Sequence, residues 1–110
     1  MNDLTKQIKQ IVIDCGFDKV GIAKAGPLPE DKLRQWLDKN YHGRMAYMEN
    51  YFEKRTDPTK LVEGAKSVIS VAKNYYTSFQ QKNHPSIAQI SRYAWGDDYH
   101  DVLRPRLKDI

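Results

Sequence analysis

The hydrophobic residues in the first part of the chain recur at the spacing of an α-helix. They are Leu4, Ile8, Ile11, Val12 and Cys15. Asp3 is placed to cap the start of this helix, and Gly16 is placed to end it. The pattern therefore predicts an amphipathic helix with Cys15 in its buried stripe, where the thiol serves packing and not chemistry.

Two further elements are predicted before residue 44. Phe17–Lys24 carries Val20 and Ile22 on one face and is typical of a strand. The prolines and glycine at 26–29 interrupt the chain. From Glu30 the helical period returns and predicts a second helix that stops at Asn40.

A stripe of methionine and aromatic residues predicts a third helix, which closes at Arg55 before Thr56-Asp57-Pro58. Its members are Met45, Met48, Tyr51 and Phe52. Proline at 58 forbids continuation of this helix, because it lacks the backbone donor and restricts the residue before it. Arg55 has two open interpretations: it completes the helix dipole and pairs with Asp57, or it reaches into a neighbouring pocket.

Strands dominate the prediction for the next part of the chain. Ser67–Tyr76 is a mostly apolar, β-branched run, which predicts a central strand covered on both faces. Residues 77–86 are polar and turn-forming, so we expect an exposed loop in which His84 is solvated. Residues 87–95 are then predicted to form a third strand.

A Gly-Asp-Asp turn and a final helix follow the predicted third strand. The helix has an apolar face, although Pro105 predicts a kink or a late start near Asp101. Four groups able to carry charge or protons lie at its start: Asp97, Asp98, His100 and Asp101. Asp98 is either a helix cap with an acidic third residue or part of a ligand site, since helix starts offer unpaired backbone donors.

The order of these elements predicts an α/β or α+β fold with a small sheet of about three strands flanked by helices. The apolar face of the last helix still runs at Ile110, so we expect an incomplete domain. A length of 110 residues corresponds to one modest core and not two.

Composition narrows the possible settings of the protein. No apolar run approaches the roughly 20 residues that cross a bilayer, so no membrane segment is expected. One cysteine and the absence of a secretory signal favour a cytoplasmic location. The formal charge of +4 is compatible with a polyanionic partner such as RNA.

Few kinds of chemistry are indicated by the residues alone. The single cysteine and three scattered histidines lack zinc or iron-sulfur ligand spacing, so no metal site is predicted. Phosphate-binding loops and nucleophile triads are equally unsupported. What remains is the acid-base capacity of residues 97–101 and the flat aromatic surface of Tyr93, Trp95 and Tyr99.

Several stretches, taken in their order and spacing, resemble the N-terminal part of epoxyqueuosine reductase. They are GFDKVGIA at 16–23, WLDKNYHGRM at 36–45, FEKRTDP at 52–58, GAKSVISV at 64–71, NYY at 74–76 and SRYAWGDDYHDVLR at 91–104. The resemblance covers essentially the whole chain. It implies that residues 1–110 are the N-terminal portion of a cobalamin-binding domain.

The family resemblance implies a cobalamin-dependent enzyme with two [4Fe-4S] clusters. That enzyme removes the epoxide oxygen from epoxyqueuosine at the wobble position of tRNA, the last step of queuosine synthesis. Carried over by position, Arg55 and Ser91 are expected to contact cobalamin. Asp98 is only a weak catalytic candidate, because the family's proton donor and its cluster cysteines lie downstream of Ile110.

We therefore expect a fragment that supplies part of the cobalamin site, is inactive alone and lacks the C-terminal cluster domain. The alternative is a cofactor-free module that binds RNA or another protein, which the net charge favours. A cob(II)alamin titration would separate the two hypotheses.

Overall fold

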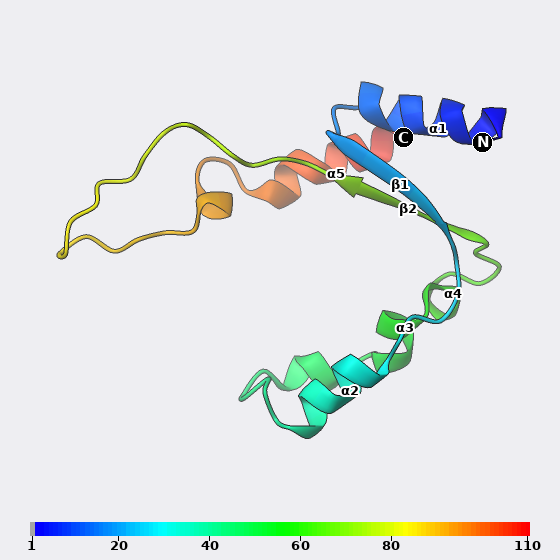
Figure 1. Ribbon diagram of the computed structural model, residues 1–110, viewed down its shortest axis with the longest axis horizontal. Coiled ribbons are helices and arrows are strands. Elements are labelled where there is room, and N and C mark those ends of the chain that lie inside the picture. The colour runs from blue at the N-terminus through cyan, green and yellow to red at the C-terminus, as the bar shows by residue number, and fades with distance from the viewer. Residues whose placement is uncertain (1) are drawn as a thin grey trace. The chain divides into compact units, whose positions relative to one another are not determined.

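The structure is a computed structural model that describes residues 2–110 (Figure 1). Their helices and strands are α1 (Asp3–Asp14), β1 (Lys19–Lys24), α2 (Asp31–Asp38), the 3₁₀ helix η1 (Ala46–Glu49), α3 (Phe52–Thr56), α4 (Pro58–Leu61), β2 (Ser67–Ala72), the 3₁₀ helix η2 (Arg92–Ala94) and α5 (Tyr99–Asp109). Helices and a small antiparallel sheet make this an α+β fold, which confirms the predicted class.

The chain divides into two compact units. One, here called the terminal unit, contains the chain up to Gly21 together with Ser70–Ile110. The other, here called the middle unit, is Ile22–Ile69. Each unit has its own small buried centre: Val12 and Phe17 in the terminal unit, His42 and Thr56 in the middle unit.

The sheet consists of β1 and β2 among the residues that the structure describes. Backbone hydrogen bonds continue the ladder at both ends, from Asp18 N to Ala72 O and from Ala25 N to Lys66 O, each at 2.9 Å. The prediction of a central strand covered on both faces is wrong, because most β2 residues are exposed and Ile69 is 43% exposed. The strand also ends at Ala72, four residues before the predicted Tyr76.

Helix α1 confirms the periodicity of the first segment. Its cap is Asn2 and not Asp3: the Asn2 side chain accepts a hydrogen bond from Leu4 N at 3.2 Å. Gly16 ends the helix as predicted, with φ of +95°, a conformation that strains any residue carrying a Cβ. Cys15 is half-buried, so it lies at the edge of the buried stripe.

The predicted continuous helix over 45–55 is wrong. It is split into η1 and α3, because Asn50 is extended and Tyr51 has the left-handed φ of +57°. Left-handed backbone cannot continue a right-handed helix. The helix does end at Thr56, as Pro58 requires, and Asp57 then caps the short α4 by accepting from Thr59 N at 2.9 Å.

The predicted third strand over 87–95 is also wrong. This stretch is irregular and then forms η2. Instead of a neighbouring strand, the side-chain amide of Gln81 pairs with the backbone of Ile90, accepting from its N–H at 3.0 Å. The exposed loop over 77–86 is confirmed, and His84 within it is exposed as predicted.

Helix α5 begins at Tyr99 and includes Pro105. The late start near Asp101 is therefore wrong. Arg106 of this helix reaches the end of α1, where its Nη1 donates to Gly16 O at 2.9 Å. This contact joins the last helix to the first within the terminal unit.

Candidate functional site

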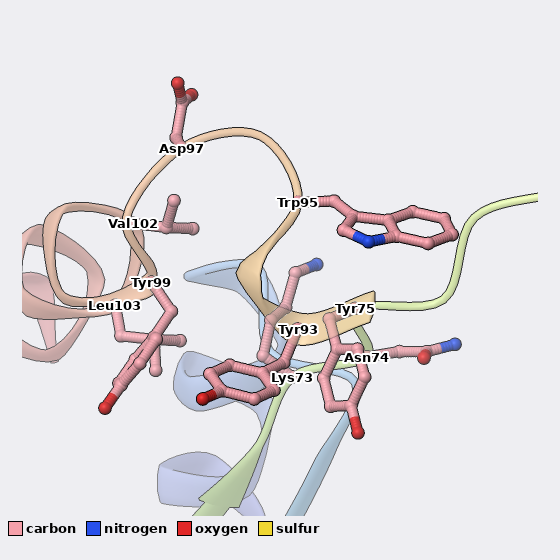
Figure 2. A pocket seen from close by; sticks show the side chains of 9 residues that line it. All are labelled: Lys73, Asn74, Tyr75, Tyr93, Trp95, Asp97, Tyr99, Val102 and Leu103. Atoms are coloured by element: carbon pink, nitrogen blue, oxygen red, sulfur yellow. The ribbon is translucent and has the colours of Figure 1, made fainter. Parts of the chain in front are cut away.

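The main candidate site is an aromatic cleft of about 460 Å³ in the terminal unit (Figure 2). Three segments build it: the residues directly after β2, the residues around η2, and the start of α5. Its lining side chains are Lys73, Asn74, Tyr75, Tyr93, Trp95, Asp97, Tyr99, Val102 and Leu103. A cleft of this size is in the usual range for small-molecule sites.

Asp18 fixes the strand side of the aromatic cleft. Its carboxylate accepts a hydrogen bond from Asn74 N at 2.6 Å and lies 3.7 Å from Lys73 Nζ. The backbone hydrogen bond from Asn74, with the charge of Lys73 adding to it, lowers the pKa of Asp18 below its ordinary value of 3.8. The ionised carboxylate therefore holds the chain where it leaves β2.

Four ring side chains make edge and face contacts along the cleft. Tyr75 and Tyr93 meet edge to face with ring centroids 6.4 Å apart, and Tyr93 and Tyr99 do so at 6.2 Å. His100 stacks on Tyr99 at 4.1 Å. Tyr75, Tyr93 and Tyr99 are nevertheless between 48% and 66% exposed, so the cleft presents flat aromatic surface to a ligand.

Asp98 acts as the cap of α5, one of the two roles that the sequence left open. It accepts from His100 N at 2.9 Å and lies 2.8 Å from His100 Nδ1. The backbone hydrogen bond, followed by the ring contact, lowers the pKa of Asp98 below 3.8. A carboxylate held ionised in this way is poorly suited to donate a proton at neutral pH.

Arg92 lies between two aromatic rings beside the cleft. Its guanidinium carbon is 4.6 Å from the centre of the Tyr76 ring and 5.1 Å from that of Trp95. Its Nε is buried and has no hydrogen-bond partner among residues 2–110. Trp95 itself is held in place because its Nε1 donates to Ile90 O at 3.0 Å.

Ser91, one of the two predicted cofactor contacts, is an exposed residue in the terminal unit, directly before η2. Its carbonyl oxygen accepts from Ala94 N at 3.0 Å, which closes the 3₁₀ turn. Its hydroxyl makes no hydrogen bond among the described residues. The side chain is therefore available to a ligand.

Arg55, the other predicted cofactor contact, is in the last turn of α3 in the middle unit. It donates from Nη2 to Tyr47 O at 3.3 Å and from Nη1 to Met48 O at 3.5 Å, two carbonyls of η1. Arg55 forms no ion pair with Asp57 among residues 2–110, so that part of the first of its two interpretations is wrong. Arg55 and Ser91 belong to different units.

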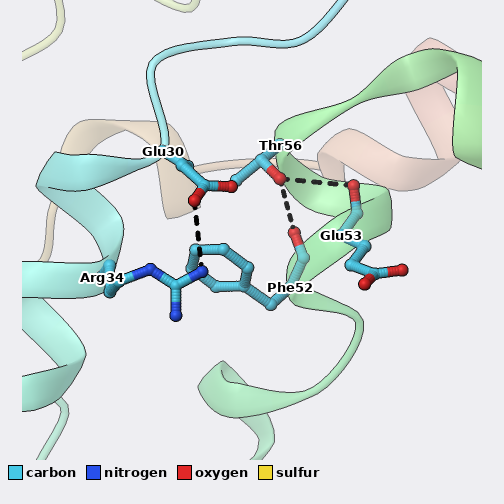
Figure 3. Close-up of polar contacts among 5 residues, drawn as sticks. All are labelled: Glu30, Arg34, Phe52, Glu53 and Thr56. Carbon is cyan, nitrogen blue, oxygen red and sulfur yellow. Dashed lines mark hydrogen bonds and ion pairs between the residues drawn. The ribbon is translucent and has the colours of Figure 1, made fainter.

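The middle unit contains a second arginine on an aromatic ring (Figure 3). The Arg34 guanidinium carbon is 4.5 Å from the centre of the Phe52 ring, and its Nη2 lies 3.2 Å from Glu30 Oε1. Thr56 Oγ1 donates to Phe52 O at 2.9 Å and lies 3.3 Å from Glu53 O. These groups satisfy one another locally.

The described residues give two further findings about classes of site. Within residues 2–110, no three His, Cys, Asp or Glu side chains gather closely enough to hold a metal ion. Each helix of this range is too short or too polar to cross a lipid bilayer.

Sequence reasoning identified Tyr93, Trp95 and Tyr99 as aromatic surface, and the structure brings all three into one cleft. It misses Lys73 and Tyr75 as cleft residues, because the sequence pattern predicts that the strand continues through residues 73–76. A signal was present: the polar pair Lys73-Asn74 interrupts the β-branched run directly after Ala72.

The chain is similar to proteins named epoxyqueuosine reductase. It is 50% identical over 108 residues to that of Cyclobacterium marinum, which covers 96% of this chain and 35% of the relative. It is 49% identical over 110 residues to that of Leadbetterella byssophila, with 98% and 36% covered. It is 40% identical over 115 residues to that of Escherichia coli strain K12, with 100% and 30% covered. No solved structure matches.

The fold is α+β, and its aromatic cleft lies at the start of α5. The family described as "Epoxyqueuosine reductase QueG, DUF1730" matches residues 55–110, and this chain belongs to that family. It spans about a third of the length of the curated relatives given above.

Proposed function

We propose that this chain forms part of the cobalamin site of an epoxyqueuosine reductase, an enzyme that converts epoxyqueuosine in tRNA to queuosine. The observation that carries the proposal is that the family match over 55–110 includes η2, the start of α5 and every residue that lines the aromatic cleft. The part of the chain that matches the family is thus the part that builds the aromatic cleft.

The aromatic cleft fits one edge of a corrin ring. A corrin is a flat, largely apolar macrocycle with amide arms. Tyr75, Tyr93 and Tyr99 offer exposed flat faces to the ring, and Lys73 and Asn74 offer hydrogen-bonding groups to the arms. The volume of about 460 Å³ is too small for the whole cofactor, so this cleft would form only part of the wall.

Arg55 and Ser91 are proposed as further contacts to the cofactor. Arg55 is exposed and keeps part of its guanidinium free while it holds two η1 carbonyls, so it retains donors for an amide or a phosphate. The Ser91 hydroxyl has no partner within residues 2–110 and can donate or accept. Both roles come from the family resemblance.

The reaction proposed for the whole enzyme is a reductive deoxygenation. Removing the epoxide oxygen as water consumes two electrons and two protons. Cobalamin would supply the redox chemistry at the epoxide, and [4Fe-4S] clusters would supply the electrons. We place the clusters, the proton donor and the main tRNA contacts in the part of the relatives that this chain does not match. We also propose that the whole enzyme is cytoplasmic. The 110 residues alone are then expected not to reduce the epoxide.

The proposal is tested by adding cob(II)alamin to the purified chain and recording its absorption spectrum. We expect a saturable spectral change that weakens at least fivefold in Arg55→Ala and in Tyr93→Ala. Arg44→Ala is the matched control, since Arg44 is an exposed arginine outside the proposed contacts. An unchanged spectrum with the wild-type chain, or equal affinity of Arg55→Ala and Arg44→Ala, contradicts the proposal.

The second candidate function is a cofactor-free RNA-binding module. The observation that favours it is the combination of a +4 charge with exposed rings such as Tyr75 and Phe79, since nucleobases stack on aromatic side chains. Salt-dependent RNA binding without any change in the cobalamin spectrum would support this candidate over the first.

A further inference from the structure

A second cleft, of about 430 Å³, lies beside the aromatic one, and Trp95 lines both. Its chemistry is different, because amide side chains dominate it. Besides Trp95 it is lined by Gln80, Gln81, Asn83, Gln89, Ile90 and Arg92. One cation and no carboxylate therefore face this cleft, here called the amide cleft.

Arg92 is unusual among the arginines of the terminal unit in how it is held. Its guanidinium carbon lies 4.6 Å from the centre of the Tyr76 ring and 5.1 Å from that of Trp95, and contacts with two rings restrict where the group can move. No carboxylate lies within ion-pair distance of it among residues 2–110. Its charge is thus left uncompensated in a pre-oriented position, an arrangement that suits a planar, two-pronged contact to an oxyanion.

The partial burial of Arg92 increases the stabilisation that a bound anion would give. Its Nε is buried without a hydrogen-bond partner, so water solvates this cation incompletely. A fully hydrated arginine gains little from an ion pair, whereas a partly desolvated one gains more. The amides of Gln80 and Asn83 have no partner within the described residues and supply neutral donors beside the cation.

The rim of the amide cleft is built before any ligand arrives. Gln81 accepts from Ile90 N at 3.0 Å, and Gln89 Nε2 donates to Lys82 O at 3.1 Å. These side-chain to backbone contacts tie the two sides of the loop together. The backbone that carries the free amides of Gln80 and Asn83 is therefore restrained before a ligand binds, which reduces the entropy lost on binding.

We propose that Arg92 and the amide cleft bind a phosphodiester. The single positive charge matches the single negative charge of that group, and the amides match its oxygens. Two sources share this chemistry: the backbone of an RNA strand, and the phosphodiester in the nucleotide loop of cobalamin. The inference rests on the proposed function only in the choice of RNA and cobalamin as the two sources of the phosphodiester.

The test measures affinity for each source by the fluorescence of Trp95, in a Trp36→Phe background that removes the other tryptophan. The probes are a single-stranded RNA octamer, cobalamin, and cobinamide, which lacks the nucleotide loop. The variants are Arg92→Gln, which removes the charge, and Arg92→Lys, which keeps the charge but loses the planar fork. Circular dichroism checks that each variant folds.

The matched control is Arg34→Gln in the middle unit. Arg34 also lies on an aromatic ring, but Glu30 already compensates its charge. We expect Arg92→Gln to weaken binding at least tenfold and Arg92→Lys by a smaller factor, with Arg34→Gln within twofold of wild type. For RNA, the slope of log K against log salt should also decrease by about 0.7, the value for one single-strand phosphate contact.

The outcomes separate the two sources and the two proposals. A loss for RNA assigns the site to the RNA backbone, and a loss for cobalamin but not cobinamide assigns it to the cofactor. A third outcome is that Arg92→Gln binds cobalamin as tightly as the wild type does, and that RNA binding is either unchanged by this substitution or absent. This outcome overturns the inference and leaves the proposed function standing. RNA binding through Arg92 without cobalamin binding supports the inference and overturns the proposed function. No binding of either probe by the folded wild-type chain overturns both.

Discussion

Arg34 and Arg92 present the same local motif in two regions of the molecule, an arginine over an aromatic ring. In the middle unit, Glu30 lies 3.2 Å from Arg34, and the pair is satisfied within the protein. In the terminal unit, Arg92 lies between Tyr76 and Trp95 with no carboxylate partner among the described residues. The same geometry thus leaves the charge of Arg34 compensated within the protein, whereas the charge of Arg92 has no carboxylate partner among the described residues.

The difference extends to the surroundings of each arginine. Around Arg34, the hydroxyl of Thr56 is used by backbone carbonyls of α3. Around Arg92, exposed tyrosines and free amides line two clefts. The two cation–π contacts therefore differ in charge compensation: Arg34 has a carboxylate partner, and Arg92 has none among the described residues.

The largest expected effect concerns the buried histidine of the middle unit. His42 is 4% exposed, its Nε2 lies 2.8 Å from Glu49 Oε1, and its ring packs against Trp36. His42→Ala should lower the free energy of unfolding by about 2–4 kcal/mol, because it leaves a cavity and removes the hydrogen bond. Urea denaturation followed by Trp36 fluorescence, in a Trp95→Phe background, measures this. Glu49→Gln is the control, and an equal loss there would contradict the role of burial.

The next effect concerns the anchor of the terminal unit at Gly16. With φ of +95°, a Cβ at this position is strained and would also lie 2.7 Å from Arg106 Nη1. Gly16→Ala should lower the free energy of unfolding by about 1–2 kcal/mol. The Trp95 signal reports it in the Trp36→Phe background. Gly21→Ala is the control, because a Cβ there meets no atom within 4 Å; a similar loss in both variants would argue against the anchor.

A direct comparison of the two arginines in stability has a smaller expected effect. Arg34→Met should lower the free energy of unfolding by about 1 kcal/mol, since it removes a cation–π contact and an exposed ion pair. Arg92→Met should change it less, because methionine keeps contact with the rings and removes a buried donor that has no partner. Urea midpoints of the two variants provide the measurement. A larger loss for Arg92→Met would mean that Arg92 serves structure and not ligand binding.

The smallest effect is a pH dependence at the start of α5. The pKa of Asp98 is lowered from 3.8 by the His100 hydrogen bonds, so its cap stabilises the folded state above the unfolded-state value. That contribution is lost as the pH falls below 3.8 through the lower folded-state pKa. Far-UV circular dichroism between pH 2 and 5 should show a small loss of helical signal. Asp98→Asn should remove this pH dependence while keeping a cap; an unchanged acid transition would assign it to other carboxylates.

Local patterns in the sequence predicted much of the fold. The helical stripe of residues 4–15, the breaks at Gly16 and Pro58, and the cap at Asp98 all depend on near neighbours, and the structure confirms them. Such features are decided within a few residues by steric restrictions and backbone hydrogen bonding. The proposed cofactor contacts of Arg55 and Ser91 stay predictions.

Tertiary structure decided what the local patterns could not. Residues 87–95 have strand-forming composition but lack a strand partner among the described residues. The backbone N–H of Ile90 donates instead to the Gln81 side chain. The aromatic cleft depends on Asp18 holding Asn74, a contact between residues 56 positions apart. The sequence alone therefore determined the first helix, the chain breaks at Gly16 and Pro58 and the final helix, because those choices are local. Only the tertiary structure decided which rings converge in the cleft and that Phe52 and Tyr76 lie against Arg34 and Arg92, because these contacts join residues distant in the chain.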